Sequence, residues 1–314
     1  MTRKTHKMIN ITFGINDTYA KYCSATIASV LTNHKLLSDE DKIHFFILGN
    51  LSDATKTKLL SLKRIQDFEC SFINIDDSVF SKIPLKGYHV SGCYRLLIPE
   101  ILPSSVEKII YLDSDLILNI DIKKLWDINI DSHLLAAVID EPQNNRKNTY
   151  FNAGISVYNV KNLKAFNFPD KWRGYVEALP KGATLKYYDQ DILNAIIDNV
   201  LFLPPSWNVE KYNLRQMLKS GKSISELSKE IYIIHYTTQA KPWFPLSDHP
   251  FKNLYVKYAK MTPWADEIAN HSLTAKTSYL AKLILKYWLI HPVFFLRPKF
   301  YRKVRENGFL TTII

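Results

Sequence analysis

Cysteine is scarce in this chain of 314 residues, and the spacing of the few cysteines excludes two kinds of protein. Cys23, Cys70 and Cys93 lie far apart, and none of them belongs to a C-x-x-C pair. Such spacing builds neither a disulfide framework nor a zinc site. We therefore expect three reduced thiols that pack as small apolar side chains, in a protein of a reducing compartment.

Several familiar motifs and segments are also missing. No G-x-G-x-x-G and no G-x-x-x-x-G-K-[ST] follows a predicted strand, which argues against a dinucleotide-binding fold and against a P-loop. The N-terminus, MTRKTHKMINITFGIND, has basic residues but no apolar run of the length that a signal peptide requires. Because no Pro/Gly/Ser-rich linker and no repeat interrupts the first 260 residues, we expect one domain there.

Positive charge is concentrated at one end of the chain. The net charge is +11, but eight Lys and Arg against Glu306 alone give residues 276–314 a charge of +7. A nucleic-acid-binding domain would carry such charge on a face or groove of its folded part. The distribution instead suggests that the tail meets an anionic surface.

Apolar runs alternate with helical patterns in the first part of the chain. Runs at 9–15, 43–49 and 70–75 predict buried strands, and apolar residues at helical spacing follow the first two, at 19–31 and 53–65. This order predicts an α/β fold with a mainly parallel central sheet and helices on both faces. Strand-like segments recur at 134–140 and 150–160. In such sheets, ligands bind outside the carboxyl ends of the strands.

The sequence YLDSDLI at 111–117 places two carboxylates between apolar residues. In a strand, Asp113 and Asp115 would face the same side. Two ionised carboxylates in a poor dielectric repel each other and are costly to desolvate. A divalent cation removes the repulsion, and oxygen ligands suit Mn²⁺ or Mg²⁺. D-x-D is also common in solvated turns. Because apolar residues flank it on both sides here, a metal site and a solvated turn explain the motif equally well.

Two residues further along the chain could complete such a site. His235 ends a strand-like run and could be a third metal ligand, while Lys241 could neutralise the charge of a diphosphate leaving group. Each has a structural alternative, namely a buried histidine held by hydrogen bonds and a surface lysine beside a turn.

The segment YYDQDILNAII at 187–197 predicts a loop that leads into a helix. Asp189 and Asp191 suit the N-terminus of a helix because of its macrodipole, but this alternative does not explain Gln190. In YFNAGISVYNV at 150–160, Gly154 either allows a close approach of the backbone or marks only the start of a strand.

Together these segments resemble glycosyltransferase family 8, the retaining enzymes of GT-A fold that include bacterial galactosyl- and glucosyltransferases of the lipopolysaccharide outer core. The resemblance covers about residues 9–264. It rests on six blocks in family order: FGINDTYAKYCSATIASVL, YRLLIPEILP, KIIYLDSDLILNIDIKKLWD, YFNAGISVYNVKNL, DQDILN and HYTTQAKPW.

The resemblance implies a metal site and a diphosphate site. Asp113, Asp115 and His235 match the ligands of the metal, Mn²⁺ or Mg²⁺. Lys241 matches a lysine that contacts the diphosphate of the UDP-sugar donor, and Arg95 matches an arginine that contacts the donor sugar and the diphosphate.

The resemblance also implies residues around the transferred sugar. Asn152, Asp189 and Gln190 match polar residues there, with Asp189 and Gln190 as the catalytic pair and Gln190 near the reacting face of the anomeric carbon. Within 13–19 the chain matches the nucleotide-binding turn after the first strand. The remaining expected nucleotide-sugar contacts are Gly14, Ile15, Asn16, Tyr19, Ser114 and Ala153.

Three positions depart from the family pattern. Asn16 stands where the family often has Asp, and Thr18 where it often has Asn. Asn16 can still accept a hydrogen bond from uracil N3–H, without the charge. Thr238 replaces a glycine that lets the backbone approach the phosphates, so the details of diphosphate binding differ there.

The resemblance implies a metal-dependent retaining hexosyltransferase that moves glucose or galactose from a UDP-sugar to a saccharide acceptor, in the lipopolysaccharide outer core. The alternative is a non-catalytic protein of the same fold that binds nucleotide sugars or glycans. The metal-ligand set and Gln190 argue against that alternative, because degenerate relatives would lose ligands first.

We expect a catalytic domain at 1–264 and a small, basic, helical segment at 265–314. The longest apolar run of the tail, at 287–296, is shorter than the roughly 20 residues that cross a bilayer. Interleaved Lys, Arg and aromatic residues are typical of a peripheral anchor on an anionic membrane, here the cytoplasmic face of the inner membrane. The alternative is a C-terminal helix docked on its own domain.

Overall fold

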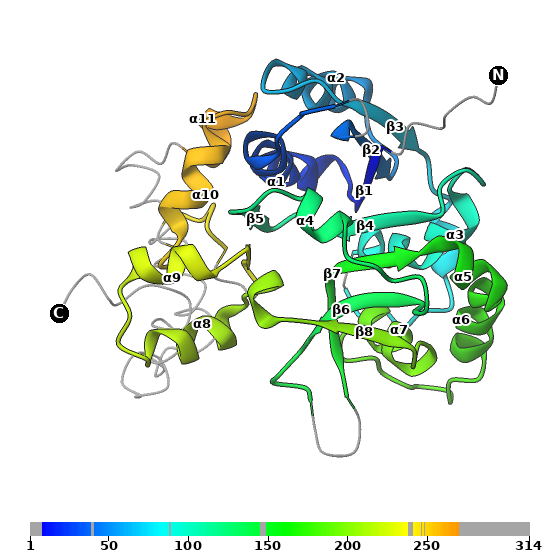
Figure 1. Ribbon diagram of the computed structural model, residues 1–314. Helices are drawn as coiled ribbons and strands as arrows, with labels where there is room; N and C mark the ends of the chain where they lie inside the picture. The colour runs from blue at the N-terminus through cyan, green and yellow to red at the C-terminus, as the bar shows by residue number, and fades with distance from the viewer. Residues whose placement is uncertain are drawn as a thin grey trace, which may run out of the picture.

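A seven-stranded sheet in the order β3-β2-β1-β4-β7-β6-β8 forms the centre of the protein in the computed structural model (Figure 1). The structure describes residues 8–38, 41–87, 89–144, 149–237, 241–245, 247 and 249–269. The strands of this sheet are β1 (Ile9–Gly14), β2 (Ile43–Leu48), β3 (Glu69–Ile73), β4 (Lys108–Leu112), β6 (Leu135–Ile139), β7 (Phe151–Asn159) and β8 (Val200–Leu203). Only β7 is antiparallel to its neighbours, β4 and β6. The prediction of a mainly parallel sheet is therefore confirmed.

Helices cover both faces of this sheet, as predicted. The α-helices are α1 (Asp17–Asn33), α2 (Asp53–Leu60), α3 (Ile98–Ile101), α4 (Lys123–Trp126), α5 (Val160–Ala165), α6 (Phe168–Glu177), α7 (Asp189–Ile196), α8 (Lys211–Leu218), α9 (Ile224–Glu230), α10 (Lys252–Ala259) and α11 (Ala265–Ile268). Short 3₁₀ segments are η2 (Ser61–Arg64), η3 (Asp77–Phe80), η4 (Val90–Leu97) and η5 (Pro205–Trp207). Asn16 begins α1, because its side chain accepts a hydrogen bond from the Tyr19 N–H.

Alternate residues of the central strands supply two separate hydrophobic cores. In β4, Ile110 and Leu112 pack with α1 and α10, whereas Ile109 and Tyr111 pack with α5, α6 and α7. All four side chains are buried. Since each such side chain contributes about 1.5–3 kcal/mol on burial, both faces are strongly held, and the strand ends between them are fixed in position.

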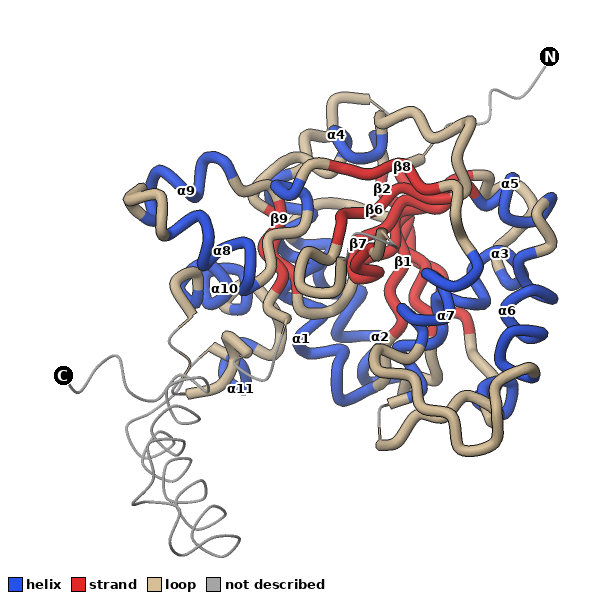
Figure 2. The backbone as a smooth tube through the Cα atoms, turned by 90° about the horizontal axis from the view of Figure 1, so that it is seen from below, coloured by secondary structure: helices blue, strands red, loops and turns tan. Residues whose placement is uncertain are grey.

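A second, two-stranded sheet extends the molecule beyond β4. It pairs β5 (Leu116–Leu118) antiparallel with β9 (Ile233–His235), so that Leu116 lies opposite His235. Figure 2 shows α8, α9 and α10 together on this side of the protein, away from α5 and α6. The pairing places two segments that are far apart in sequence next to each other.

The two aspartates of D-S-D follow the carboxyl end of the strand predicted at 109–112, as expected, but they lie in a turn and not in the alternating register of a strand. β4 ends at Leu112 and β5 begins at Leu116, and these strands belong to different sheets. The turn between them lets the chain leave the central sheet. The two carboxylates therefore come together through this turn and not through the alternation of a single strand.

The described part of the chain ends at residue 269, so the predicted membrane segment lies almost wholly outside the described residues. Within the described part, Ile268 of α11 packs in the core beside α10. None of the helices described is both long and apolar enough to cross a membrane. Cys23 and Cys93 are buried and Cys70 is partly buried, and all three are free thiols.

Candidate active site

The carboxyl ends of β1, β4 and β6 and the amino end of β7 meet at one edge of the central sheet. Because β7 alone runs in the opposite direction, its first residues lie beside the last residues of β4. The Asp113 N–H donates to the Gly154 carbonyl over 2.8 Å and continues this pairing past the end of the strand. The polar residues that follow each strand thus gather at the edge where α/β proteins bind ligands.

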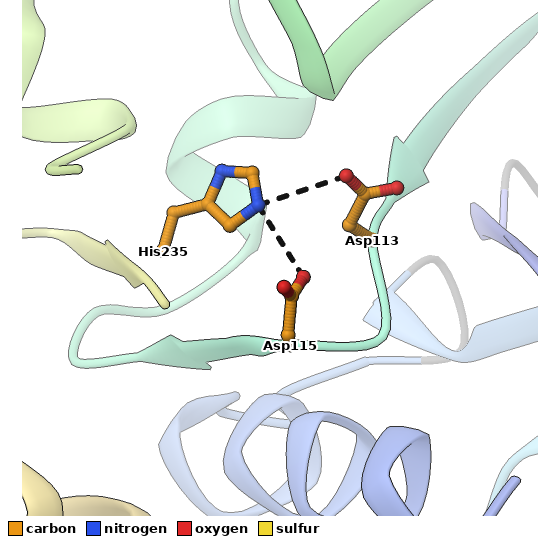
Figure 3. A group of neighbouring side chains, drawn as sticks. All are labelled: Asp113, Asp115 and His235. Carbon is orange, nitrogen blue, oxygen red and sulfur yellow. Dashed lines mark ion pairs between the residues drawn. The ribbon is translucent and has the colours of Figure 1, made fainter. Parts of the chain in front are cut away.

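Asp113, Asp115 and His235 form a cluster that can hold a metal ion (Figure 3). One ligand atom from each lies within 4.8 Å of the other two. His235 Nε2 is 3.6 Å from Asp113 Oδ2 and 3.3 Å from Asp115 Oδ1. One imidazole and two carboxylates are a donor set that suits Mn²⁺, and carboxylates also suit Mg²⁺.

Gly154 forms the floor of this cluster. A Cβ atom on residue 154 would lie 2.4 Å from His235 Cε1 and 2.6 Å from Asp113 Oδ2. Both distances are far below van der Waals contact, so only glycine allows the two ligands to come this close. Of the two interpretations of Gly154, the structure supports a close approach, here of two side chains to the backbone.

A cationic side chain lies against each of the two carboxylates, Lys241 against Asp115 and Arg95 against Asp113. Lys241 contacts Asp115 and donates a hydrogen bond to the Tyr236 carbonyl over 2.8 Å. Burial alone would raise the pKa of Asp115, but Lys241 and His235 together hold it well below its usual value. Burial alone would lower the pKa of His235, yet the two aspartates outweigh it and raise that pKa.

Arg95, at the end of η4, links the metal cluster to the predicted catalytic residues. Its guanidinium is buried and donates to Asp113 Oδ1 over 2.7 Å and to the Ala153 carbonyl over 2.6 Å. Its Nε lies 2.9 Å from Asp189 Oδ2. Burial raises the pKa of Asp189 to about 7, because Arg95, which is shared with Asp113, offsets only part of the desolvation.

Asp189 and Gln190 occupy the first turn of α7, beside the start of β7. Gln190 Oε1 accepts a hydrogen bond from the Ala153 N–H over 3.0 Å, and Gln190 Nε2 donates to Asp140 Oδ2 over 3.1 Å. Tyr188, which precedes them, has a φ of 47°, a strained conformation for a residue other than glycine. The pair is therefore more than a helix N-terminus, because Gln190 is tied to the strand that carries Asn152 and Ala153.

The predicted nucleotide-binding turn lies at the end of β1, on the same edge. Gly14 is pressed against η4, since a Cβ there would lie 2.7 Å from the Ser91 carbonyl oxygen. The side chain of Ile15 is buried, whereas the Tyr19 side chain is 40% exposed. Asn16 uses Oδ1 to cap α1, and its Nδ2 lies 2.7 Å from His89 Nε2.

Ser114 lies in the turn between the two aspartates, and its carbonyl accepts a hydrogen bond from Thr26 Oγ1 over 3.1 Å. The described residues that the sequence assigned to the site lie at the ends of β1, β7 and β9, in the turn after β4, in η4 and in the first turns of α1 and α7, and Lys241 lies against Asp115. Thr238 lies outside the described residues.

The sequence interpretation missed three polar residues at this edge. Asp140 follows β6, and this position at a strand end was a usable signal. Asn208 is fully buried and hydrogen-bonds to both His235 and Asn152, but no motif in its neighbourhood marks it. At Glu210, burial raises the pKa to about 7, although His235 opposes this shift.

Comparison with known proteins gives consistent matches. The model of the family described as Glycosyl transferase family 8 matches residues 10–246, well over half of the chain. General stress protein A of Bacillus subtilis is 26% identical over 82% of this chain and 95% of its own length. Lipopolysaccharide 1,2-glucosyltransferase of Escherichia coli is 24% identical over 95% of this chain and 93% of its own length.

A solved structure shares the fold. The galactosyltransferase LgtC, crystallised with donor and acceptor sugar analogues, superposes with a TM-score of 0.68 at 21% identity. The superposition covers 86% of this chain and 99% of that one.

Proposed function

The chain belongs to glycosyltransferase family 8, and on that premise we propose that it is a metal-dependent retaining hexosyltransferase with a UDP-sugar as donor. The hexose would be glucose or galactose, and the acceptor a saccharide, in the lipopolysaccharide outer core. The observation that carries this proposal is the cluster of Asp113, Asp115 and His235, with Lys241 beside it.

The cluster fits a divalent metal, as the space left by Gly154 and the donor set indicate. Asp113, Asp115 and His235 would hold the ion, which would act as a Lewis acid on the donor diphosphate. Lys241 would add a second positive charge at the same diphosphate, where charge develops as the bond to the sugar breaks. Arg95 keeps Asp113 and Asp189 in place for this arrangement.

Retention requires either a protein nucleophile or attack from the same face that the diphosphate leaves. Of the carboxylates that the sequence assigned to the site, Asp113 and Asp115 are in the metal cluster, and Asp189 is buried against Arg95. Asp140 accepts a hydrogen bond from Gln190 Nε2. Gln190 is an amide and a poor nucleophile. We therefore favour front-face attack, in which the acceptor hydroxyl bonds to the anomeric carbon, the UDP leaves with the bonding electrons, and a diphosphate oxygen takes the hydroxyl proton.

Hydrogen bonds fix the orientation of two amide side chains, Asn152 and Gln190, that we assign to the sugar side. Asn152 Oδ1 is occupied by the Gly154 N–H and by Asn208, so the Asn152 Nδ2 is the group left for the donor sugar. Gln190 is held between Ala153 and Asp140, which fixes its carbonyl toward the strand. This orientation supports a role for Gln190 in placing the reacting sugar.

The proposed acceptor and location rest on the similarity to the lipopolysaccharide glucosyltransferase, which extends over 95% of this chain. A lipid-linked acceptor would lie at the cytoplasmic face of the inner membrane. The basic and aromatic segment at 276–314 would hold the enzyme at that surface, with each Lys or Arg adding about 1 kcal/mol on anionic lipid.

The test is hydrolysis of a panel of UDP-sugars without acceptor, with Mn²⁺ and with excess chelator. We expect hydrolysis of one UDP-hexose in Mn²⁺ and none in chelator. Asp113→Asn and Asp115→Asn should abolish turnover and leave the unfolding transition in place, whereas Asp127→Asn, an exposed aspartate away from the cluster, should behave as the unsubstituted protein. Full activity in chelator would contradict the metal assignment, and donor binding without any hydrolysis or transfer would favour the non-catalytic alternative.

A further inference from the structure

We propose that Asn208 is a positioning residue that fixes the tautomer of the metal ligand His235 and couples the metal site to the sugar site. Asn208 is fully buried and directly follows η5. The chain reaches the site there because Val209 pairs with β9: its N–H donates to the Ile233 carbonyl, and its carbonyl accepts from the His235 N–H.

The orientation of each side chain in this group follows from one backbone amide. The Gly154 N–H can only donate, so the atom of Asn152 that lies 2.9 Å from it must be the carbonyl oxygen, Oδ1. Asn208 places an atom 2.8 Å from that same oxygen. This atom must be a donor, which makes it Nδ2, and the other end of the Asn208 amide is then its carbonyl oxygen.

This oxygen, Asn208 Oδ1, lies 2.9 Å from His235 Nδ1. Because the oxygen can only accept, Nδ1 must carry a proton. In the neutral ring the lone pair then resides on Nε2, the nitrogen that faces Asp113 and Asp115 (Figure 3). The hydrogen-bond chain from Gly154 through Asn152 and Asn208 thus selects the one tautomer of His235 that can bind a metal in the cluster.

The same series of hydrogen bonds also fixes the orientation of the Asn152 side chain. Its Oδ1 accepts from both Gly154 and Asn208, so the amide cannot rotate without losing two hydrogen bonds. Among the described residues no partner occupies the Asn152 Nδ2, so this group remains available to a donor sugar. Asn208 therefore orients one group for the metal and another for the sugar.

This assignment rests on the proposed function, and its test separates the two. The test measures the binding of Mn²⁺ in the presence of UDP. Binding is detected as the loss of the electron paramagnetic resonance signal of free Mn²⁺. Asn208→Leu keeps the branched shape of the side chain at Cγ but removes both hydrogen bonds. We expect it to weaken Mn²⁺ binding by about 10- to 100-fold, the usual effect of removing the partner of a metal-binding histidine.

Asn208→Asp separates the two roles. Its carboxylate still accepts from His235 Nδ1, so Mn²⁺ affinity should stay at least as high as in the unsubstituted protein. It cannot donate to Asn152 Oδ1, so the Asn152 amide should lose its orientation and the KM for the UDP-hexose should rise. A purely structural role would not divide the metal affinity and the donor KM in this way.

Asn159→Leu is the matched control. Asn159 is also buried with one donated and one accepted hydrogen bond, but it lies at the other end of β7, seven residues from Asn152 and about 23 Å away. It should lower the melting temperature and leave Mn²⁺ affinity unchanged.

The outcomes distinguish the two proposals. Equal Mn²⁺ affinity in Asn208→Leu and the unsubstituted protein would overturn the role of Asn208 alone. If Asn208→Leu does not fold, Asn208→Asp decides the matter, because a tenfold loss of Mn²⁺ affinity in that variant would also overturn the assignment. Absence of Mn²⁺ binding by the unsubstituted protein would overturn the proposed function and this assignment together.

Discussion

Gly154→Ala tests whether the floor of the metal cluster is as tight as the structure shows. The new methyl group would lie 2.4 Å from His235 Cε1, 2.6 Å from Asp113 Oδ2 and 3.1 Å from Asn152 Oδ1. Relief of these overlaps to an ordinary contact of about 3.5 Å requires shifts of about 1 Å in the two metal ligands. Neither ligand can move freely, because Arg95 and Tyr111 hold Asp113, and Asn208 holds His235.

The expected cost has two parts. Overpacking of this kind destabilises a protein by about 1–3 kcal/mol. A misplacement of about 1 Å at a reacting centre can lower the rate by about 100-fold, which is the larger and more specific effect. We therefore expect Gly154→Ala to lower both kcat and Mn²⁺ affinity, with a moderate loss in the free energy of unfolding.

The assay is Mn²⁺-dependent hydrolysis of the UDP-hexose, together with urea unfolding. Gly174→Ala is the control, because a Cβ on Gly174 in α6 would meet no atom within 4 Å. That change should leave kcat unaltered and stabilise the protein by about 0.5–1 kcal/mol. If Gly154→Ala keeps full kcat and full Mn²⁺ affinity, the cluster is not built as described.

Three further predictions address other parts of the site and the tail. Gln190→Ala should lower kcat more than it raises the donor KM, and an unchanged kcat would reduce Gln190 to a helix-terminal residue. The profile of kcat against pH should rise near pH 7 as Asp189 ionises, since its pKa is raised to about 7; Asp189→Asn should remove this rise, and Glu210→Gln should keep it. The full chain should pellet with anionic vesicles and be released by high salt, whereas a chain shortened to residue 275 that pellets equally well would place the anchor elsewhere.

The sequence predicted the central part of the fold because local signals there agree with the long-range packing. β1 and β2 are largely apolar and buried, and Asn16 both ends the first run and caps α1. The direction of β7 and the pairing of β5 with β9 were not predictable in the same way. Strand partners depend on contacts between segments far apart in sequence, and apolar periodicity carries no information about direction.

The same distinction between local signals and long-range contacts applies to the site residues. Asp113, Asp115, Gln190 and Lys241 stand in short motifs, from which the sequence predicted that they share one site, and the structure brings them to one edge of the sheet. Asn208 could not, because its role depends on partners 27 and 56 positions away, and its local sequence PPSWN is unremarkable in composition. Residues that orient a metal ligand are defined by geometry, so sequence patterns give little indication of them.

The two aspartates raised the question of what offsets their repulsion, and the structure gives an answer that the sequence argument did not contain. Each carboxylate already has a cation of its own, since Arg95 pairs with Asp113 and Lys241 contacts Asp115. A divalent ion would therefore compete with Lys241 for Asp115, while the Arg95 pair could persist on the other oxygen of Asp113. The Lys241 ammonium displaced from Asp115 would stay beside the ion. A bound diphosphate would then supply a negative charge to pair with this ammonium. Metal binding and diphosphate binding should accordingly strengthen each other, and Lys241→Met should raise metal affinity in the absence of UDP while it lowers the affinity for UDP.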